Sequence, residues 1–414
     1  MPLPLHHTPD HTMDEHLSPE ISAALFNGVE TLRPLAGRDE FDPAVPAALV
    51  RAGLHLTPVP RSAGGLGAGL RAAVSVLAAL GAEDGSAALG LAMHFHTLGS
   101  AVQSGLWPEL LLHTLLSEVV DSGALINLAA TEARGGSPAR GALPDMTAIR
   151  TENGWTLNGE KHWTTWLPAL RYAVVTARLL DTGTASQATE SEIATYLLDL
   201  RAPGVERIPA FDALGMRASA SGTLRLKNVP VPPDRLIASR KNGTPAADRP
   251  CALAWFGLCI AAVYLGVGEG ARQTVTRWAL ARKPGDGSTP VADLPLIRAR
   301  LGRLDVELRT ARIVLQDVAA RWDGAAPPER ENLLADVALA KLKATQAAAY
   351  ATDEALRIAG GPGFLCGNIE RAFRDARAGL IHPPLEDLVY QDRARLLLAR
   401  ASPGNTGRPP PGSG

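Results

Sequence analysis

Hydrophobic residues recur at helical spacing in the first and last parts of the chain, and a different pattern separates these parts. The first part repeats apolar side chains every three or four positions, which predicts a mostly helical domain. Its helical stretches are 21–32, 45–49, 69–81, 86–96 and 103–119. From residue 250 to 400 the same spacing returns in longer runs and predicts a four-helix bundle. Those runs are 253–283, 291–323, 331–360 and 385–400.

The region between these helical parts consists of short runs rich in β-branched, aliphatic and aromatic residues. The runs are 124–130, 147–151, 155–157, 173–177, 195–199 and 223–226. Turn residues such as Asn158-Gly159 and Ser221-Gly222 separate them. The pattern predicts an antiparallel sheet domain, in the form of a small barrel. We therefore expect a mostly helical α+β fold, divided as follows: disordered tails at 1–18 and 402–414, and domains at 19–122, 123–236 and 237–401.

The charge balance argues against nucleic acid or a membrane surface as a partner. The 41 Lys and Arg residues nearly match the 42 Asp and Glu residues, and no basic block stands out. Residues 251–268 carry no charge and approach the length of a bilayer span. Because Glu269 and Arg272 follow at once and the helical pattern continues, we interpret this stretch as a buried bundle helix.

The cysteines and the first residues indicate the compartment. Cys251, Cys259 and Cys366 are an odd, widely spaced set, which predicts buried thiols in a reducing environment. The chain does not open with a basic segment followed by an apolar one, as a secretory signal would. We therefore expect a cytoplasmic protein.

Two groups of histidines could suggest a metal site, and the sequence argues against both. The first 17 residues hold four of the ten histidines, but Pro9 between His7 and His11 opposes a helix there. His94 and His96 are two positions apart, which places them on different faces of a helix. The first group is better explained by a disordered tail, and His94 and His96 by packed or substrate-facing histidines, so we predict no metal.

Four tracts, in this order, resemble the acyl-CoA dehydrogenase superfamily, and the resemblance extends over about residues 19–400. The tracts are TEARGGS at 131–137, GWTLNGEKHWTT at 154–165, LGMRAS at 214–219, and GGPGF with RDAR at 360–377. The resemblance implies an N-terminal helical domain, a middle β-barrel and a C-terminal four-helix bundle. It also implies a flavin cofactor, FAD, with FMN as the alternative.

The resemblance assigns cofactor contacts to the first two tracts. Thr131, Gly136 and Ser137 are expected to line the flavin or a bound acyl thioester. Trp163 is expected to pack on the flavin ring, and Thr165 to form a hydrogen bond near its N5. A flavin needs polar partners along its pyrimidine edge and an apolar wall against its ring, which these residue types supply. The alternative is that the threonines are ordinary strand residues and the Trp is a core residue.

The resemblance also places three residues on the cofactor's diphosphate. In the family this group reaches across a dimer interface, where Arg282 of a neighbouring subunit and the bare backbone of Gly360 and Gly361 would meet it. We therefore expect a homodimer or homotetramer. The alternative for Arg282 is a solvated residue at a helix end. Four positions depart from the family pattern around the cofactor: Pro284, Arg357, Leu385 and Asp387.

The carboxylate that removes the substrate proton in the family is absent from both of its usual places. The loop that carries it has the sequence HPP at 382–384, and the second place, on the first bundle helix, holds Gly257. Glu386 and Asp387 lie about one turn further on and could act if the loop is shifted. His382 is similar to the loop histidine of flavin monooxygenases of the same superfamily, and a neutral imidazole can donate or accept a proton near pH 7. The alternative for His382 is a loop cap.

Three functions follow from these observations. The first is a flavin-dependent oxidoreductase that oxidises the α–β CH–CH bond of acyl-CoA or another acyl thioester with a displaced base, and passes electrons to an electron-transfer partner. The second is a flavin-dependent monooxygenase that uses oxygen and reduced flavin from a separate reductase, with His382 assisting. The third is a catalytically degenerate paralogue that only binds flavin or acyl chains.

Overall fold

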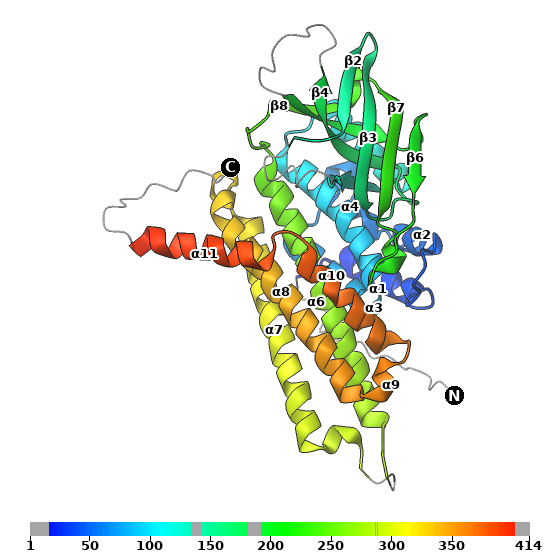
Figure 1. Ribbon diagram of the computed structural model, residues 1–414, viewed down its shortest axis with the longest axis vertical. Helices are drawn as coiled ribbons and strands as arrows, with labels where there is room; N and C mark the ends of the chain where they lie inside the picture. The colour runs from blue at the N-terminus through cyan, green and yellow to red at the C-terminus, as the bar shows by residue number, and fades with distance from the viewer. Residues whose placement is uncertain (1–15, 134–142, 181–191, 286, 288, 402–414) are drawn as a thin grey trace.

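The N-terminal part of the protein is helical, as predicted (Figure 1). The computed structural model describes residues 16–133, 143–180, 192–285, 287 and 289–401, and the expectations for the outermost tails lie outside these ranges. The first helices are α1 (Pro19–Leu32), α2 (Ala44–Arg51), α3 (Leu70–Glu83), α4 (Gly85–Ser104) and α5 (Glu109–Ser122). The single helix expected at 103–119 is wrong. Gly105 ends α4 in the left-handed conformation, and Pro108 precedes α5.

Helix α4 lies between the sheet and the C-terminal bundle and packs against both β1 and α6. Two glycines make this close packing possible. A Cβ atom at Gly90 would lie 1.9 Å from the ring of Trp166, and one at Gly99 would lie 2.4 Å from the ring of Trp255. Trp166 lies between β3 and β4 of the sheet and Trp255 belongs to the bundle, so α4 contacts both parts where it has no side chain.

The described residues of the middle part form one eight-stranded sheet. Its strands are β1 (Ile126–Ala129), β2 (Thr147–Thr151), β3 (Gly154–Thr164), β4 (Tyr172–Leu180), β5 (Glu192–Asp199), β6 (Val205–Ile208), β7 (Gly222–Val231) and β8 (Leu236–Lys241). Their order is β6-β7-β3-β2-β4-β5-β8, with β1 paired to β4. The predicted sheet domain is confirmed, although β6 and β8 were not expected because charged and polar residues interrupt their apolar pattern.

The sheet is mixed rather than antiparallel throughout. Most neighbouring strands are antiparallel, but β4 runs parallel to both β1 and β2. The segment between β3 and β4 does not form a hairpin but places β4 on the far side of β2, so that β2 and β4 are parallel. In the described residues β6 and β8 do not pair with each other, so the sheet is not a closed barrel.

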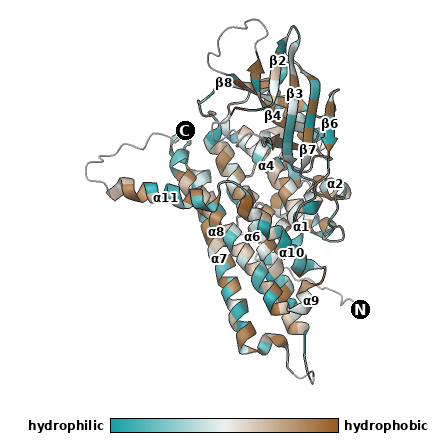
Figure 2. Ribbon diagram, viewed as in Figure 1, coloured by the Kyte–Doolittle hydropathy of each residue, from teal (hydrophilic) through white to brown (hydrophobic). Residues whose placement is uncertain are grey.

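The C-terminal part is a helical bundle, as predicted. Its members are α6 (Arg249–Ala281), α7 (Pro295–Gly324), α8 (Arg330–Ala359) and α10 (Asn368–Ile381), with the short α9 (Gly361–Phe364) before α10. The fourth member is α10, which packs on α6 and α8, and not the expected segment 385–400. That segment is α11 (Glu386–Ala401), which contacts α8 and projects from the bundle (Figure 1). Hydrophobic and hydrophilic residues are mixed along α11 (Figure 2), and its Leu397 and Leu398 are exposed.

Helix α6 contains the uncharged stretch and is the central helix of the bundle. It is long and apolar enough to cross a membrane, but 83% of its most apolar window is buried inside the protein. It packs against α3, α4 and α8, which confirms a buried bundle helix. Cys251 and Cys259 on α6 are buried as expected, whereas Cys366, between α9 and α10, is exposed and corrects the expectation of three buried thiols.

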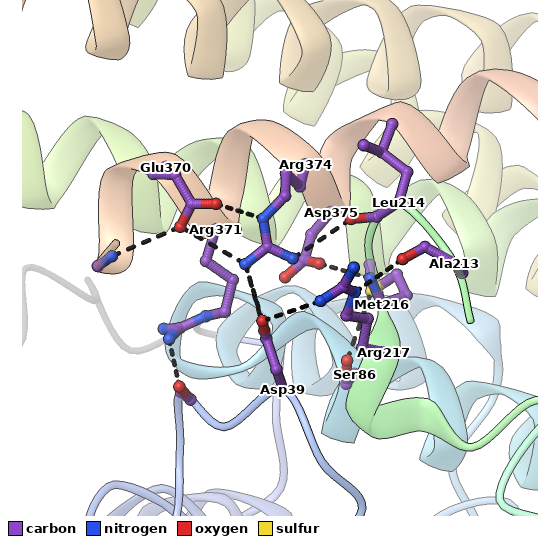
Figure 3. Close-up of polar contacts among 12 residues, drawn as sticks. Asp39, Ser86, Ala213, Leu214, Met216, Arg217, Glu370, Arg371, Arg374 and Asp375 are labelled. Carbon is purple, nitrogen blue, oxygen red and sulfur yellow. Dashed lines mark hydrogen bonds and ion pairs between the residues drawn. The ribbon is translucent and has the colours of Figure 1, made fainter. Parts of the chain in front are cut away.

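The third and fourth sequence tracts meet in a polar junction that joins the three parts of the chain (Figure 3). Buried Asp375 of α10 accepts a hydrogen bond from the amide of Met216, and burial raises the pKa of its carboxyl to about 6. Arg374 of α10 and Arg217 both reach Asp39 in the N-terminal part, at 3.2 and 3.6 Å. The junction therefore orients the sheet on the bundle.

Candidate functional site

Thr131 and Trp163 lie side by side at one end of β3. The carbonyl of Thr131 accepts a hydrogen bond from the amide of His162 at 2.8 Å, so the first two tracts meet in space. Trp163 adopts a left-handed backbone conformation (φ 58°) and its side chain is 57% exposed. Phe211, which the sequence did not single out, contacts the indole edge-on at 5.5 Å between ring centroids. Two aromatic rings and an exposed threonine thus form an open wall.

Buried polar groups lie directly beyond this wall. The Thr165 hydroxyl is 2.9 Å from that of Ser221, and the Asn127 side chain donates to the Thr165 carbonyl at 3.2 Å. The Asn127 Oδ1 and the Thr164 hydroxyl are buried without a hydrogen-bond partner among the described residues. Because buried polar atoms are nearly always paired, these atoms indicate a place for an additional polar group.

This arrangement fits a planar ring with polar edges. The exposed indole supplies an apolar face, and the hydroxyl and amide groups beyond it supply donors and acceptors. The structure therefore brings Thr131, Trp163 and Thr165 together at one end of β3, and their contact with a flavin stays a prediction. Gly136 and Ser137, which were expected to join them, lie outside the described residues.

The loop after α10 directs an imidazole toward the bundle. The Nε2 of His382 is 3.0 Å from the hydroxyl of Tyr264 on α6. The imidazole also contacts the ring of Phe256, which lies about two turns before Tyr264 on α6, at 6.1 Å between the ring centroids. Burial, together with the nearby ammonium of Lys341, lowers the pKa of His382 to about 4. The imidazole is therefore neutral at physiological pH.

A buried imidazole of α4 also contacts Phe256. The ring of His96 on α4 is 5.3 Å from that of Phe256, and its Nδ1 has no hydrogen-bond partner among the described residues. Burial lowers the pKa of His96 to about 4. His94 points elsewhere, because its two ring nitrogens bind the Ile126 amide and the His55 carbonyl. The two histidines therefore do not act as a pair, and His96 is the one that approaches the loop.

The candidate carboxylates lie on the surface and have no hydrogen bond to His382 among the described residues. Glu386 and Asp387 are exposed on the first turn of α11, and Glu386 accepts a hydrogen bond from Gln346 of α8 at 3.0 Å. Gly257, at the family's second place for a base, is buried, and a Cβ there would lie 2.9 Å from Val337. An imidazole therefore occupies the loop position where a carboxylate was sought.

Arg282, Gly360 and Gly361 lie at the end of the bundle that is remote from the sheet. Arg282 follows α6 and the two glycines precede and begin α9, and these helix ends lie far from β3 in Figure 1. All three are exposed, and the Arg282 side chain has no partner among the described residues. A Cβ at either glycine would meet open space. One chain does not bring these residues to Trp163.

The residues that the sequence did not identify are mainly aromatic. Phe256 and Tyr264 are eight positions apart on α6, which places them on one face of the helix. This spacing was a usable signal. Asn127 and Ser221 gave no such signal, because their positions beside Thr165 depend on the pairing of distant strands.

Comparison with known proteins identifies the family of both the sheet and the bundle. Residues 127–229 match the model of the acyl-CoA dehydrogenase middle domain, and residues 248–382 match that of the acyl-CoA dehydrogenase C-terminal domain. A Bacillus subtilis relative, YdbM, whose name assigns it to the acyl-CoA dehydrogenases, is 32% identical over 83% of this chain and 86% of its own length.

Solved structures show the same fold. The FMN-bound TdsC of Paenibacillus sp. A11-2 superimposes with a TM-score of 0.80 at 20% identity, over 94% of this chain and 99% of that one. Butyryl-CoA dehydrogenase from Megasphaera elsdenii superimposes with a TM-score of 0.78 at 20% identity, over 93% of this chain and 100% of that one.

Proposed function

The chain belongs to the acyl-CoA dehydrogenase family, and within this family we propose that it is a flavin-dependent monooxygenase rather than a dehydrogenase. The family supports an oxidoreductase with a flavin. The position of His382 carries the choice of reaction, because it places a neutral imidazole where the family's dehydrogenases have a carboxylate.

The bound flavin would supply the electrons that activate oxygen. Trp163 would form the wall against the ring, and Thr131 and Thr165 would bind its polar edge. His382 and His96 would approach from the bundle side, across the ring of Phe256. The aromatic lining suits a small apolar substrate that contains a ring. In support, one solved structure of TdsC is described as a dibenzothiophene monooxygenase.

His382 is suited to a role in which it stays uncharged. Burial and the nearby ammonium of Lys341 lower its pKa to about 4, so the imidazole is neutral at physiological pH. The same neutral imidazole can still donate a hydrogen bond to a reacting oxygen while it remains uncharged.

A second subunit would complete the cofactor site. If the cofactor is FAD, its diphosphate would meet Arg282 and the backbone at Gly360 and Gly361 of a neighbouring chain, since these residues lie far from the Trp163 of their own chain. A homodimer or homotetramer would then be the functional unit, and a separate reductase would deliver electrons.

Dehydrogenation of an acyl thioester is the second candidate, and the similarity to YdbM favours it. In this case Glu386 would have to act as the base. Its first-turn position on a projecting helix would allow this only if the start of α11 moved toward Tyr264.

The two reactions differ in what reacts with the flavin. With reduced flavin from a separate reductase, oxygen and a panel of ring-containing sulfur and nitrogen compounds, we expect an oxygenated product from the wild type. His382→Ala should lose at least about 100-fold of this activity, the lower range for proton transfer by a side chain. His113→Ala, an exposed histidine on α5, is the matched control and should behave as the wild type.

Anaerobic mixing with acyl-CoA thioesters tests the second candidate. Bleaching of the flavin absorbance that is lost in Glu386→Gln and kept in His382→Ala would overturn the monooxygenase proposal. A purified protein that binds neither FAD nor FMN would instead support the degenerate paralogue.

A further inference from the structure

We propose that Tyr264 and Lys341 are positioning residues that hold His382 in the tautomer protonated at Nδ1. Tyr264 contacts the ring edge, and Lys341 holds the backbone of the loop. This inference rests on the proposed function, in which His382 faces the reacting atoms. Beyond that function, the proposal identifies the ring nitrogen of His382 that carries the proton and the two residues that determine this tautomer.

Tyr264 has one hydrogen-bond partner among the described residues, and it is the Nε2 of His382 at 3.0 Å. The Tyr264 side chain is fully buried, and burial raises the pKa of its phenol, so the hydroxyl keeps its proton. A buried hydroxyl that donates to no acceptor destabilises the folded protein. The phenol therefore donates to Nε2, which must then be the unprotonated nitrogen. The proton of the neutral imidazole is left on Nδ1.

The helix that precedes the loop holds Tyr264 in place. Gly379 of α10 is buried, and a Cβ at this position would lie 2.8 Å from the Tyr264 ring. The absence of a side chain at Gly379 thus lets α10 lie directly on the aromatic ring. The distance between the phenol and His382 is in this way determined by the packing of α6 against α10.

Lys341 of α8 holds the backbone of the loop that carries His382. Its Nζ donates to the carbonyl of His382 at 2.6 Å and to that of Pro384 at 3.3 Å. Pro383 and Pro384 have no backbone N–H, so these two residues cannot donate backbone hydrogen bonds within the loop. The Lys341 side chain is buried, and no carboxylate forms an ion pair with it among the described residues. Its two hydrogen bonds to the loop are therefore its principal interactions.

Nitrogen-15 NMR of the protein labelled on histidine tests the tautomer directly. The His382 signals are identified by their absence in His382→Gln. We expect a protonated Nδ1 and an unprotonated Nε2 in the wild type, and a loss of this preference in Tyr264→Phe. A protonated Nε2 in the wild type, or an unchanged tautomer in Tyr264→Phe, would overturn the proposal. The wild-type spectrum decides the question even if the variant does not fold.

The kinetic test separates positioning from general stability. In Tyr264→Phe, kcat should fall about 10–100-fold while KM changes less than about twofold, the effect expected of a misplaced reacting group. Tyr196→Phe is the matched control, because Tyr196 is also fully buried and its hydroxyl has no partner among the described residues. Equal losses in both variants would contradict the role of Tyr264.

Lys341→Met keeps the apolar stem and removes the two hydrogen bonds. It should lower kcat by a similar factor and broaden the His382 signals, while Lys343→Met, an exposed lysine on the same helix, should change neither. Sharp, unshifted His382 signals in Lys341→Met would remove Lys341 from the proposal. If instead the tautomer is as expected but His382→Ala is fully active, the proposed function fails and the positioning of the ring stands.

Discussion

The ammonium of Lys161 lies 2.5 Å from the carboxylate of Glu132, and both side chains are almost completely buried. The same carboxylate accepts hydrogen bonds from the backbone amides of Asp145 and Met146. Lys161 is on β3 two positions before Trp163, and Glu132 directly follows Thr131. This ion pair therefore holds together the two tracts that form the aromatic wall of the site.

Lys161→Met should destabilise the protein by about 3–5 kcal/mol, because it leaves the Glu132 carboxylate buried and without its counter-charge. Denaturant unfolding measures the change. Lys227→Met is the control, since Lys227 pairs with Glu206 at 3.1 Å on the surface and should cost less than about 1 kcal/mol. The double variant Lys161→Met/Glu132→Gln should recover part of the loss. No recovery would mean that the stranded charge is not the cause.

Two glycine substitutions should differ in their effect on stability. A Cβ at Gly215 would lie 2.4 Å from the backbone oxygen of Arg374, so Gly215→Ala forces apart the junction of sheet and bundle and should cost about 1–3 kcal/mol. Gly361→Ala meets open space and should change stability by less than about 0.5 kcal/mol. Flavin titration should nevertheless show weaker FAD binding for Gly361→Ala. Unchanged binding would remove this backbone from the cofactor site.

Stability should fall as the pH is lowered from about 6.5. Burial lowers the pKa of His94 to about 3, so the folded protein keeps this ring neutral while the unfolded chain protonates it below its ordinary value of 6.5. The contribution is thus fully present above pH 6.5 and is lost as the pH falls toward 3. In His94→Gln, the proton uptake on unfolding at pH 5 should drop by about one. Urea unfolding at several pH values between 4.5 and 7.5 gives the free energy of unfolding as a function of pH, and its slope gives the proton uptake. Equal slopes in the wild type and in His94→Gln would contradict the assignment to His94.

Arg282→Ala should weaken the binding of FAD more than that of FMN. A hydrogen bond to a charged group contributes about 1.5–3 kcal/mol, which corresponds to roughly 10–100-fold in the dissociation constant. Lys283→Ala, the exposed neighbour, is the control. Flavin fluorescence titration gives both constants, and an equal effect of the two substitutions would point to general surface charge.

The sequence predicted the fold where local pattern and final packing agree. The long runs of α6, α7 and α8 and most strands were found because their periodicity also describes what they bury. The bundle's fourth member was assigned wrongly because 385–400 has helical spacing but projects as α11. The packed helix, α10, has buried positions that are partly glycine and aspartate, which hydrophobic periodicity does not register.

The candidate site was predicted as far as neighbours along the chain determine it. Thr131 and Trp163 were identified because both belong to contiguous tracts. Tyr264 shares a helix face with Phe256, but nothing near Tyr264 or Lys341 in the sequence indicates their contact with His382, which lies 118 and 41 positions further on. Long-range contacts of this kind depend on how α6, α8 and α10 pack, which local pattern does not contain.

Helix α6 has a consequence for the protein's biosynthesis. Its apolar surface is covered mainly by α3 and α4, which are made earlier, and by α8, which is made later. The ribosome adds about 5–20 residues per second, so several seconds pass between the synthesis of α6 and the completion of α8 at residue 359. During this time the surface of α6 that α8 will cover is exposed, and α6 is long and apolar enough to enter a lipid bilayer. We expect the nascent chain to need a chaperone during this interval, and a chain truncated before α8 to aggregate or associate with membranes.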